Sequence, residues 1–395
     1  MLSQEQTDRV SFNGQCDTYA WLSQRAWVEI DLSALSYNVK QLLKILSPRT
    51  QLMAVVKADA YGHGAVTVAQ TVLESGASWL GVATVPEAIQ LREAGIKAPI
   101  LILGASQTSE QIQAIAQWKL QPTLTSPKQA LVFSDTLQTI NNKTPVPVHI
   151  KLDTGMSRLG TNSDQAAEFV QLVQRLPHLA IASIYSHLAT ADSPDSTIMK
   201  QQQQRFEQAI AQLRTIGIEP PCLHLANSAA TLTDKALHYD IARVGLAVYG
   251  LYPADHLRSC IDLRPVLQVK ARVTQVKTIA PGTGVSYGHQ FIAKRELRLA
   301  VVGIGYADGI PRNLSNKMQV LIRGQRVPQI GTITMDQLML DVSALPDVGE
   351  GEVVTLLGTE EKEQISAEDW ANQLNTISWE ILCGFKHRLP RVAVP

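Results

Sequence analysis

Cysteine is scarce in this 395-residue chain, and charge of neither sign predominates. The four cysteines form no CxxC pair, so the sequence predicts neither a zinc site nor a dithiol redox centre, and no metal is expected. The 35 basic residues balance the 35 acidic ones, which gives no reason to expect nucleic acid or an anionic membrane as a partner. The composition therefore points to a small-molecule ligand.

Long apolar runs are also missing. No run reaches the length of a transmembrane helix, and residues 1–25 are polar and lack the apolar centre of a signal peptide. We therefore expect a cytoplasmic protein with an N-terminal extension over residues 1–25. The fractions of 45% hydrophobic and 18% charged residues are typical of a globular protein with a large core, and the length exceeds that of one compact domain.

Apolar strands alternate with amphipathic helices after this extension. A strand at 27–30 leads into a helix over 32–46, with Asp31 as its N-cap. Eight further strands follow, each separated from the next by a helical segment, and this alternation predicts a closed (β/α)8 barrel of the TIM type over residues 26–264. The strands are expected near 51–56, 79–83, 100–103, 121–124, 146–151, 180–185, 221–224 and 239–243, and the clearest helices over 64–75, 85–94, 126–140, 163–175 and 196–215.

The pattern changes over residues 265–395, which we predict to form a mainly β C-terminal domain. Turn residues separate the strand-like segments there, and only one late helix is expected. That helix would open at Ser366, because Ser366 and Asp369 have the spacing of a capping box. The strand-like segments are 266–279, 297–304, 318–322 and 353–357.

A single lysine stands at the end of the first apolar strand of the predicted barrel. Lys57 follows the run Leu52–Val56, and α/β folds place their chemistry at the carboxyl ends of strands. A lysine with restricted access to water can have a lowered pKa, which makes its amine a nucleophile toward an aldehyde. The alternative is a lysine that extends to solvent from a strand end.

Polar side chains also follow the other predicted strands, and the carboxyl ends of barrel strands share one mouth. Barrels often bind phosphate after the seventh and eighth strands; there Ser228 supplies a hydroxyl and Gly245 permits close approach of the backbone. The whole set is Tyr61, Lys151, Asp153, Arg158, His187, Asn227, Ser228, Arg243 and Gly245.

Each of these residues also has a purely structural interpretation. His187 alone is typical of a buried structural histidine, Arg158 could pair with Asp153, the asparagine–serine pair could cap the next helix, and Arg243 could belong to a buried ion pair. Taken together, one lysine, one phosphate-like site and several cations at one mouth favour a phosphorylated aldehyde cofactor. Pyridoxal phosphate is the obvious candidate.

At this point the chain resembles the alanine racemase family from about Trp27 to Val392. That family has a barrel that binds pyridoxal 5'-phosphate, followed by a β domain. Six motifs in the right order carry the resemblance: AVVKADAYGHG at 54–64, DTGMSRLG at 153–160, ARVG at 242–245, VSYG at 285–288, GYADG at 305–309 and ITMD at 333–336.

The resemblance implies a two-base mechanism. Lys57 would bind the cofactor covalently and act as one base, and Tyr287 would be the other base, on the opposite face of the substrate carbon. The family works as a homodimer in which the second subunit supplies this tyrosine. His187 and Arg243 would form a hydrogen-bonded chain between Tyr287 and the cofactor ring. An arginine only donates hydrogen bonds, so it would oppose protonation of the pyridine nitrogen.

The resemblance also implies the binding residues and two departures from the family pattern. Thr332 stands where an arginine is common, and Trp379 stands where a tyrosine near the phosphate is common. The residue matching Lys151 is often carbamylated, which would place an anion beside Arg158. The cofactor-binding set would be Tyr61, His187, Asn227, Ser228, Arg243, Gly245, Leu246 and Trp379, and the substrate-binding set Arg158, Tyr306 and Met335.

We therefore predict an amino-acid racemase that interconverts L-alanine and D-alanine and supplies D-alanine for peptidoglycan. The alternatives are a racemase that also accepts serine, a non-catalytic regulator that binds pyridoxal phosphate, a decarboxylase of the same fold type, and an unrelated phosphate-binding scaffold. The β domain with Tyr287 argues against the regulator. Arg243 argues against the decarboxylase, and Lys57 at the barrel mouth argues against the scaffold.

Overall fold

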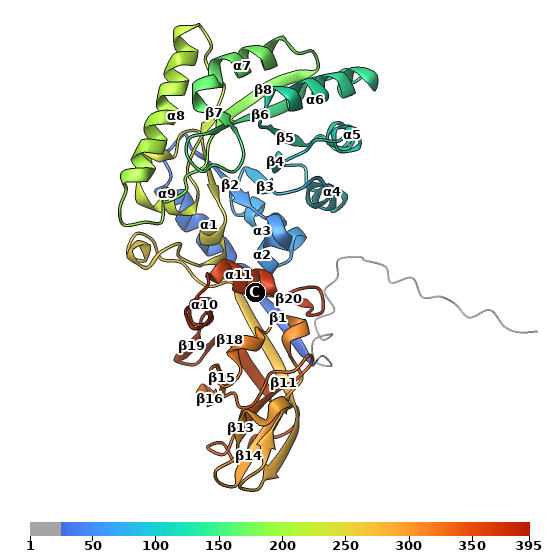
Figure 1. Cartoon of the computed structure of the whole chain (residues 1–395), viewed down its shortest axis with the longest axis vertical. Helices are drawn as coiled ribbons and strands as arrows, with labels where there is room; N and C mark the ends of the chain where they lie inside the picture. Colours follow the sequence, from blue (N-terminus) through green and yellow to red (C-terminus); the bar gives the residue numbers. More distant parts are fainter. Residues whose placement is uncertain (1–24) are drawn as a thin grey trace, which may run out of the picture.

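A computed structural model describes residues 25–395 of the chain. The predicted extension over residues 1–25 thus lies almost entirely outside the described residues. Figure 1 shows two parts, a barrel with surrounding helices and an elongated β domain, joined through the central region that contains β1, β20 and α11.

Eight parallel strands form the barrel, as predicted. In the sheet, the order of hydrogen-bonded neighbours is β10-β2-β3-β4-β5-β6-β8-β9. Backbone hydrogen bonds from Asp240 to Leu223 (2.9 Å) and from Arg243 to Ala226 (3.0 Å) close the ring. The strands are β2 (Gln51–Val55), β3 (Trp79–Val82), β4 (Ile100–Ala105), β5 (Gln121–Leu124), β6 (Val146–Asp153), β8 (Leu179–Tyr185), β9 (Leu223–His224) and β10 (Ile241–Val244), with β7 (Thr161–Asn162) beside β6.

Amphipathic helices cover the outside of this barrel. In α7, for example, Ala166, Phe169, Val170 and Val173 are buried, a spacing that places one apolar stripe on the strands. Asp31 caps the first helix as predicted, by accepting a hydrogen bond from the Ala34 backbone N–H at 2.7 Å. The helices are α1 (Leu32–Ile45), α3 (Ala65–Glu74), α4 (Val85–Glu93), α5 (Ser109–Gln117), α6 (Pro127–Thr139), α7 (Ala166–Arg175), α8 (Thr197–Thr215) and α9 (Ser228–Thr233).

The C-terminal part is mainly β, which also confirms the prediction. Its longest strand, β11 (Leu267–Ile279), pairs with β1 and β18 in its first half and with β14 from Val273 onward, with a shift of register between Val273 and Gln275. The other strands are β12 (Gly284–Val285), β13 (Phe291–Ile292), β14 (Leu297–Val302), β15 (Gln319–Ile322), β16 (Gln325–Pro328), β17 (Leu338–Asp341), β18 (Val353–Glu360), β19 (Glu363–Ile365) and β20 (Arg391–Val394).

The first strand belongs to this C-terminal sheet. β1 (Ala26–Asp31) pairs antiparallel with β11 and parallel with β20, although the sequence pattern grouped it with the barrel. Both ends of the described chain therefore tie the barrel to the β domain. The domain limits at 26, 264 and 265 stay a prediction.

Two helices precede the last strand, where one was predicted. α10 (Ala367–Leu374) begins at Ser366, and the expected capping box is present. The unpredicted helix α11 (Ser378–Gly384) has only seven residues, too few for a periodic apolar pattern to be recognised. α11 packs against the turn after β2 and so reaches the barrel mouth. Within residues 25–395, no helix is both long and apolar enough to cross a membrane.

Candidate active site

One cavity at the mouth of the barrel collects every barrel residue that the sequence singled out as a cofactor- or substrate-binding candidate. These side chains come from the carboxyl ends of β2, β6, β8, β9 and β10, and α11 adds Trp379. The lining includes Lys57, Tyr61, Lys151, Arg158, His187, Asn227, Ser228, Arg243, Gly245, Leu246 and Trp379.

The turn that follows Lys57 is a left-handed coil, labelled α2 (Lys57–Gly62). Four successive residues, Ala58 to Tyr61, have φ between 52° and 54°, a conformation that costs about 1–2 kcal/mol per non-glycine residue. Contacts from other elements hold it. Glu87 accepts from the Ala58 N–H at 2.8 Å, and Arg391 on β20 donates to the Gly62 carbonyl at 3.0 Å. The sequence predicted a loop here, and its left-handed path depends on these distant partners.

This coil brings the Tyr61 hydroxyl against Gly245. A Cβ at position 245 would lie 2.6 Å from the Tyr61 oxygen, so only glycine leaves the space that the two groups share. The Gly245 N–H donates to Ser228 Oγ at 3.0 Å. The hydroxyls of Tyr61 and Ser228 beside this glycine are groups suited to a phosphate.

The neighbouring asparagine has a structural role. Asn227 caps α9 by accepting a hydrogen bond from the Ala230 N–H at 3.0 Å, which is the structural interpretation considered for this pair. Ser228 does not share that role, because its hydroxyl oxygen accepts hydrogen bonds from the backbone N–H groups of Gly245 and Ala247 in the loop after β10.

Arg243 is a buried cation held by neutral acceptors. It is 4% exposed and donates to the carbonyls of Ser186 (2.8 Å) and Leu225 (3.1 Å) and to Nδ1 of His224 (3.1 Å) and His187 (3.2 Å). Among the described residues it has no carboxylate partner. Burial lowers its pKa to about 10. The ion-pair interpretation of Arg243 is therefore wrong, and the predicted contact with His187 is confirmed.

The basic groups of the cavity depress one another's pKa values. Burial and then the charge of Arg158 lower the pKa of Lys57. Burial, followed by Arg243 and Arg158, lowers the pKa of Lys151 to about 8. Burial and Arg243 hold the pKa of His187 well below its ordinary value. Such a site favours an anionic ligand and a neutral amine at Lys57.

Arg158 does not pair with Asp153 in the described part of the chain. One oxygen of Asp153 instead accepts from the N–H groups of Gly155, Met156 and Ser157 at 2.9–3.1 Å, which shapes the loop after β6. Arg158 is exposed on the cavity wall, so its guanidinium is available to a ligand.

The residues predicted in the β domain lie elsewhere in the chain. Tyr287 is 73% exposed and lines a separate cavity with Gln337 and Met339. Thr332, the departure noted above, donates to the Tyr287 carbonyl at 2.8 Å and so fixes its backbone. Tyr306 and Met335 are also exposed, at 42% and 52%. Within one chain, these residues do not join the cavity that contains Lys57.

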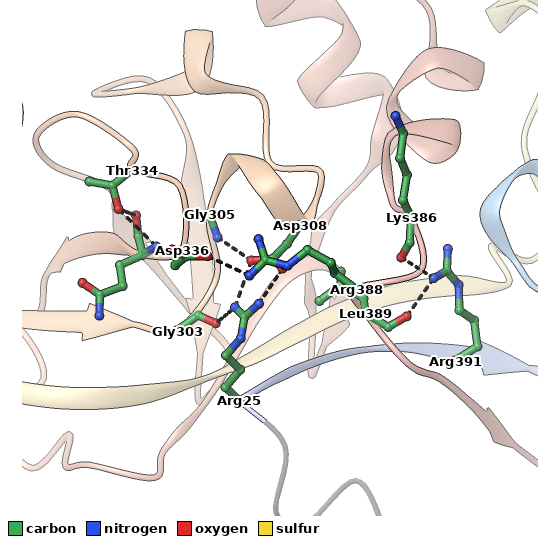
Figure 2. Close-up of polar contacts among 11 residues, drawn as sticks. Arg25, Gly303, Gly305, Asp308, Thr334, Asp336, Lys386, Arg388, Leu389 and Arg391 are labelled. Carbon is green, nitrogen blue, oxygen red and sulfur yellow. Dashed lines mark hydrogen bonds and ion pairs between the residues drawn. The ribbon is translucent and has the colours of Figure 1, made fainter. Parts of the chain in front are cut away.

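An ion cluster holds the loops that carry Tyr306 and Met335 (Figure 2). Asp308, whose side chain is fully buried, binds Arg25 at 2.6 and 2.9 Å and lies 3.5 Å from Arg388. Arg388 also binds Asp336 at 2.7 Å. The two loops are joined directly as well, because the Tyr306 N–H donates to Thr334 O at 3.0 Å. The cluster therefore fixes one loop relative to the other.

Sequence reasoning missed four residues around the barrel cavity. Tyr185 ends β8, and its ring lies 5.4 Å from the Lys151 Nζ and 5.1 Å from the Arg243 guanidinium carbon; its place just before His187 was the available signal. The others are Asp192 and Cys383 in the lining and His224 beside Arg243. Cys383 lies on α11, which the sequence pattern did not reveal.

Comparisons with known proteins agree over nearly the whole chain. Residues 30–253 match the family described as "Alanine racemase, N-terminal domain", and residues 266–393 match "Alanine racemase, C-terminal domain". The chain is 78% identical over 380 residues to an alanine racemase of Nostoc sp., covering 96% of this chain and 98% of the relative. It is 62% identical over 373 residues to one of Synechocystis sp., covering 94% and 100%.

The solved structure of alanine racemase from Bacillus anthracis with bound L-Ala-P has a TM-score of 0.88 and 35% identity, covering 94% of this chain and 95% of that one. The fold, the site and these relatives define an amino-acid racemase. Both parts of the molecule match the same family in the same order. The chain belongs to the alanine racemase family, which confirms the resemblance, the fold class and the enzyme class predicted from the sequence.

The ion cluster yields a prediction on stability. Asp308→Asn removes the buried charge that faces Arg25 and Arg388, and we expect a loss of about 2 kcal/mol, below the full cost of breaking a buried pair because both arginines are partly exposed. Urea unfolding measures the loss. The matched control is Glu219→Gln, since Glu219 pairs with Arg214 on the surface and should hardly move the midpoint. Equal midpoints for the two variants would contradict the role of the cluster.

The lowered pKa of Lys151 yields a prediction on pH. The unfolded chain binds more protons than the folded one between pH 8 and 10.5, so Lys151 destabilises the fold most below pH 8 and progressively less as pH rises. We expect Lys151→Met to be more stable than wild-type protein with an unmodified Lys151 by about 2 kcal/mol at pH 7. This gain should fade toward pH 10.5. Denaturant titrations at several pH values test this. A gain that is independent of pH, or a loss at pH 7, contradicts it.

Proposed function

We propose that this racemase interconverts L-alanine and D-alanine with pyridoxal 5'-phosphate, and that a second copy of the chain completes its active site. One observation carries the proposal. Lys57 lines the barrel cavity, whereas Tyr287 lies 73% exposed in a separate cavity of the β domain. Racemisation needs a proton acceptor on one face of the α-carbon and a donor on the other. A site that contains both Lys57 and Tyr287 therefore needs the β domain of a second copy at the barrel mouth.

The residues at the mouth fit pyridoxal phosphate. Lys57 has an amine with a lowered pKa for the aldehyde. Tyr61 and Ser228 place hydroxyls beside Gly245, where a side chain would collide with the Tyr61 oxygen, and this suits the phosphate. The buried guanidinium of Arg243 would face the pyridine nitrogen. When bound, the cofactor supplies the electron sink that acidifies the α-proton of the amino acid.

The chain's own residues perform the proton transfers. The amine of Lys57, whose pKa is lowered by burial and then by the charge of Arg158, would take or return the α-proton on one face. The phenol of Tyr287 from the second copy does the same on the other face. Arg158 on the cavity wall would hold the substrate carboxylate, together with the Met335 backbone and Tyr306 of the second copy.

Arg243 limits competing reactions in this scheme. It is a permanent donor, and neither a carboxylate nor any other group among its described partners could protonate the facing ring nitrogen. By opposing protonation of that nitrogen, Arg243 would disfavour transamination and decarboxylation relative to proton return. We also propose that the enzyme works in the cytoplasm and that its D-alanine serves peptidoglycan synthesis.

The attachment residue can be identified chemically. Borohydride reduction of the purified holoenzyme should fix the cofactor to Lys57, because this lysine lines the cavity and begins the coil that brings Tyr61 to the phosphate-type cradle at Gly245. Mass spectrometry of peptides locates the added mass, and Lys57→Ala, which should carry none, is the control. Labelling of Lys151 instead would refute the assignment.

The shared site can be tested by mixing two inactive variants. Lys57→Ala and Tyr287→Phe should each lose most activity alone, and co-expression should restore about one quarter of the wild-type rate, since half of the dimers are mixed and each has one intact site of two. A circular-dichroism assay with L-alanine and D-alanine measures the rate in both directions. Absence of recovery in dimers proven to be mixed would show that both bases come from one chain.

A further inference from the structure

A line of hydrogen-bonded side chains crosses the barrel interior beneath the active site. Nη1 of Arg243 and Nδ1 of His224 are 3.1 Å apart, and Nε2 of His224 and Oγ of Ser183 are 2.7 Å apart. Ser183 Oγ lies 2.5 Å from Nδ1 of His149, whose Nε2 lies 2.8 Å from Oε1 of Gln121. We call these five residues the barrel chain. It starts at the mouth on β10, crosses β9, β8 and β6, and ends at the first residue of β5.

The arginine end determines the direction of the first two hydrogen bonds. A guanidinium only donates, so Nδ1 of His224 must accept and carries no proton. His224 is fully buried, and burial followed by the charge of Arg243 holds its pKa well below the ordinary value. The neutral ring therefore has its single proton on Nε2, which donates to Ser183 Oγ.

The remaining two bonds follow from the first two. The Ser183 hydroxyl accepts from His224, and its own proton is directed to Nδ1 of His149. Burial lowers the pKa of His149 to about 3, so this ring is also neutral and its proton lies on Nε2. That N–H donates to the amide oxygen of Gln121. Every donor in the barrel chain therefore points away from Arg243 and every acceptor points toward it.

We propose that the barrel chain is a one-way hydrogen-bond relay that orients the Arg243 guanidinium and compensates its buried charge without a carboxylate, which makes Ser183 and His149 positioning residues for racemisation. The functional part of this inference rests on the proposed place of Arg243 against the cofactor ring. The relay itself depends only on the geometry of the five side chains.

The surroundings of Arg243 explain why a neutral relay is used. Hydrogen bonds aligned in one direction polarise one another, so the Nδ1 lone pair of His224 becomes a stronger acceptor for the buried cation. A carboxylate would stabilise the cation more strongly, but it would cancel the positive field at the barrel mouth and offer a proton-accepting site beside Arg243. The relay stabilises Arg243 and leaves its full charge to act on the ligand.

Aromatic neighbours keep the two imidazoles in place. The His224 ring stacks on Tyr185 with centroids 4.5 Å apart and planes at 8°. The edge of His149 meets Trp79 at 5.7 Å and 90°. Rotation of either ring would break these contacts as well as two hydrogen bonds, so the alignment is part of the packed core.

Neutron diffraction from deuterated crystals tests the relay directly, whatever the cofactor chemistry. We expect deuterium on Nε2 of both His224 and His149 and none on either Nδ1, with the Ser183 hydroxyl directed at His149. A deuteron on Nδ1 of either ring, or on both nitrogens of one ring, would overturn the proposed direction.

Substitutions test the effect on the reaction. Ser183→Ala interrupts the relay, and we expect kcat to fall on the order of tenfold, the effect of losing about one buried hydrogen bond, with KM changed by less than about twofold. Ser183→Thr retains the hydroxyl and should recover most of the loss. The matched control is Ser134→Ala, which removes another buried hydroxyl, bonded to the Pro177 carbonyl at 3.0 Å, and should leave kcat unchanged.

A second variant covers the case in which Ser183→Ala does not fold. Gln121 is only half-buried at the start of β5, so Gln121→Met removes the last acceptor without opening a cavity in the core. We expect kcat to fall at least about threefold. Wild-type kcat in Gln121→Met, or equal losses in Ser183→Ala and Ser134→Ala, would overturn the positioning role. The mixed-dimer experiment tests the proposed function separately, because it substitutes Lys57 and Tyr287 and leaves every residue of the barrel chain unchanged.

Discussion

A buried positive charge with no carboxylate partner among residues 25–395 is the constraint on which the site depends. Arg243 lies under the barrel mouth and is held by two backbone carbonyls and two neutral imidazoles. Burial, and after it the charge of Arg243, lowers the pKa values of both His187 and Lys151. Because desolvation of a cation is costly, the acceptors must be placed accurately, and the closed barrel supplies them from the ends of two neighbouring strands, β8 and β9.

The second constraint is the distance between the two halves of the site. Within one chain, the barrel mouth holds the lysine and the phosphate-type cradle, while the β domain exposes an aromatic and apolar set that includes Tyr287 and Met335. Large exposed side chains on ordered loops are costly unless another surface covers them. The cluster around Asp308 orders these loops, so the β domain presents a preformed surface, which agrees with a site shared between two copies.

Much of the fold could be predicted from the sequence, because the barrel is built from local patterns. Buried parallel strands are apolar along their whole length, and the helices between them show the 3.6-residue period. Residues at strand ends such as Lys57, His187 and Arg243 can therefore be assigned to one mouth from the sequence alone. The prediction failed where patterns are short. α11 has too few residues to show a period, and β1 resembles a barrel strand although its partners, β11 and β20, lie far along the chain.

The sequence by itself determined the order of strands and helices and the identity of the groups at the barrel mouth, because apolar periodicity and residue chemistry are properties of short segments. The class of enzyme came from the six motifs that resemble a known family. Only the tertiary structure decided how those groups act on one another. The left-handed coil after Lys57 exists because Glu87 and Arg391 hold it, and the direction of the hydrogen bonds through His224 and His149 follows from the burial of Arg243. Both depend on contacts between residues far apart in sequence, and such contacts leave no mark in any local pattern.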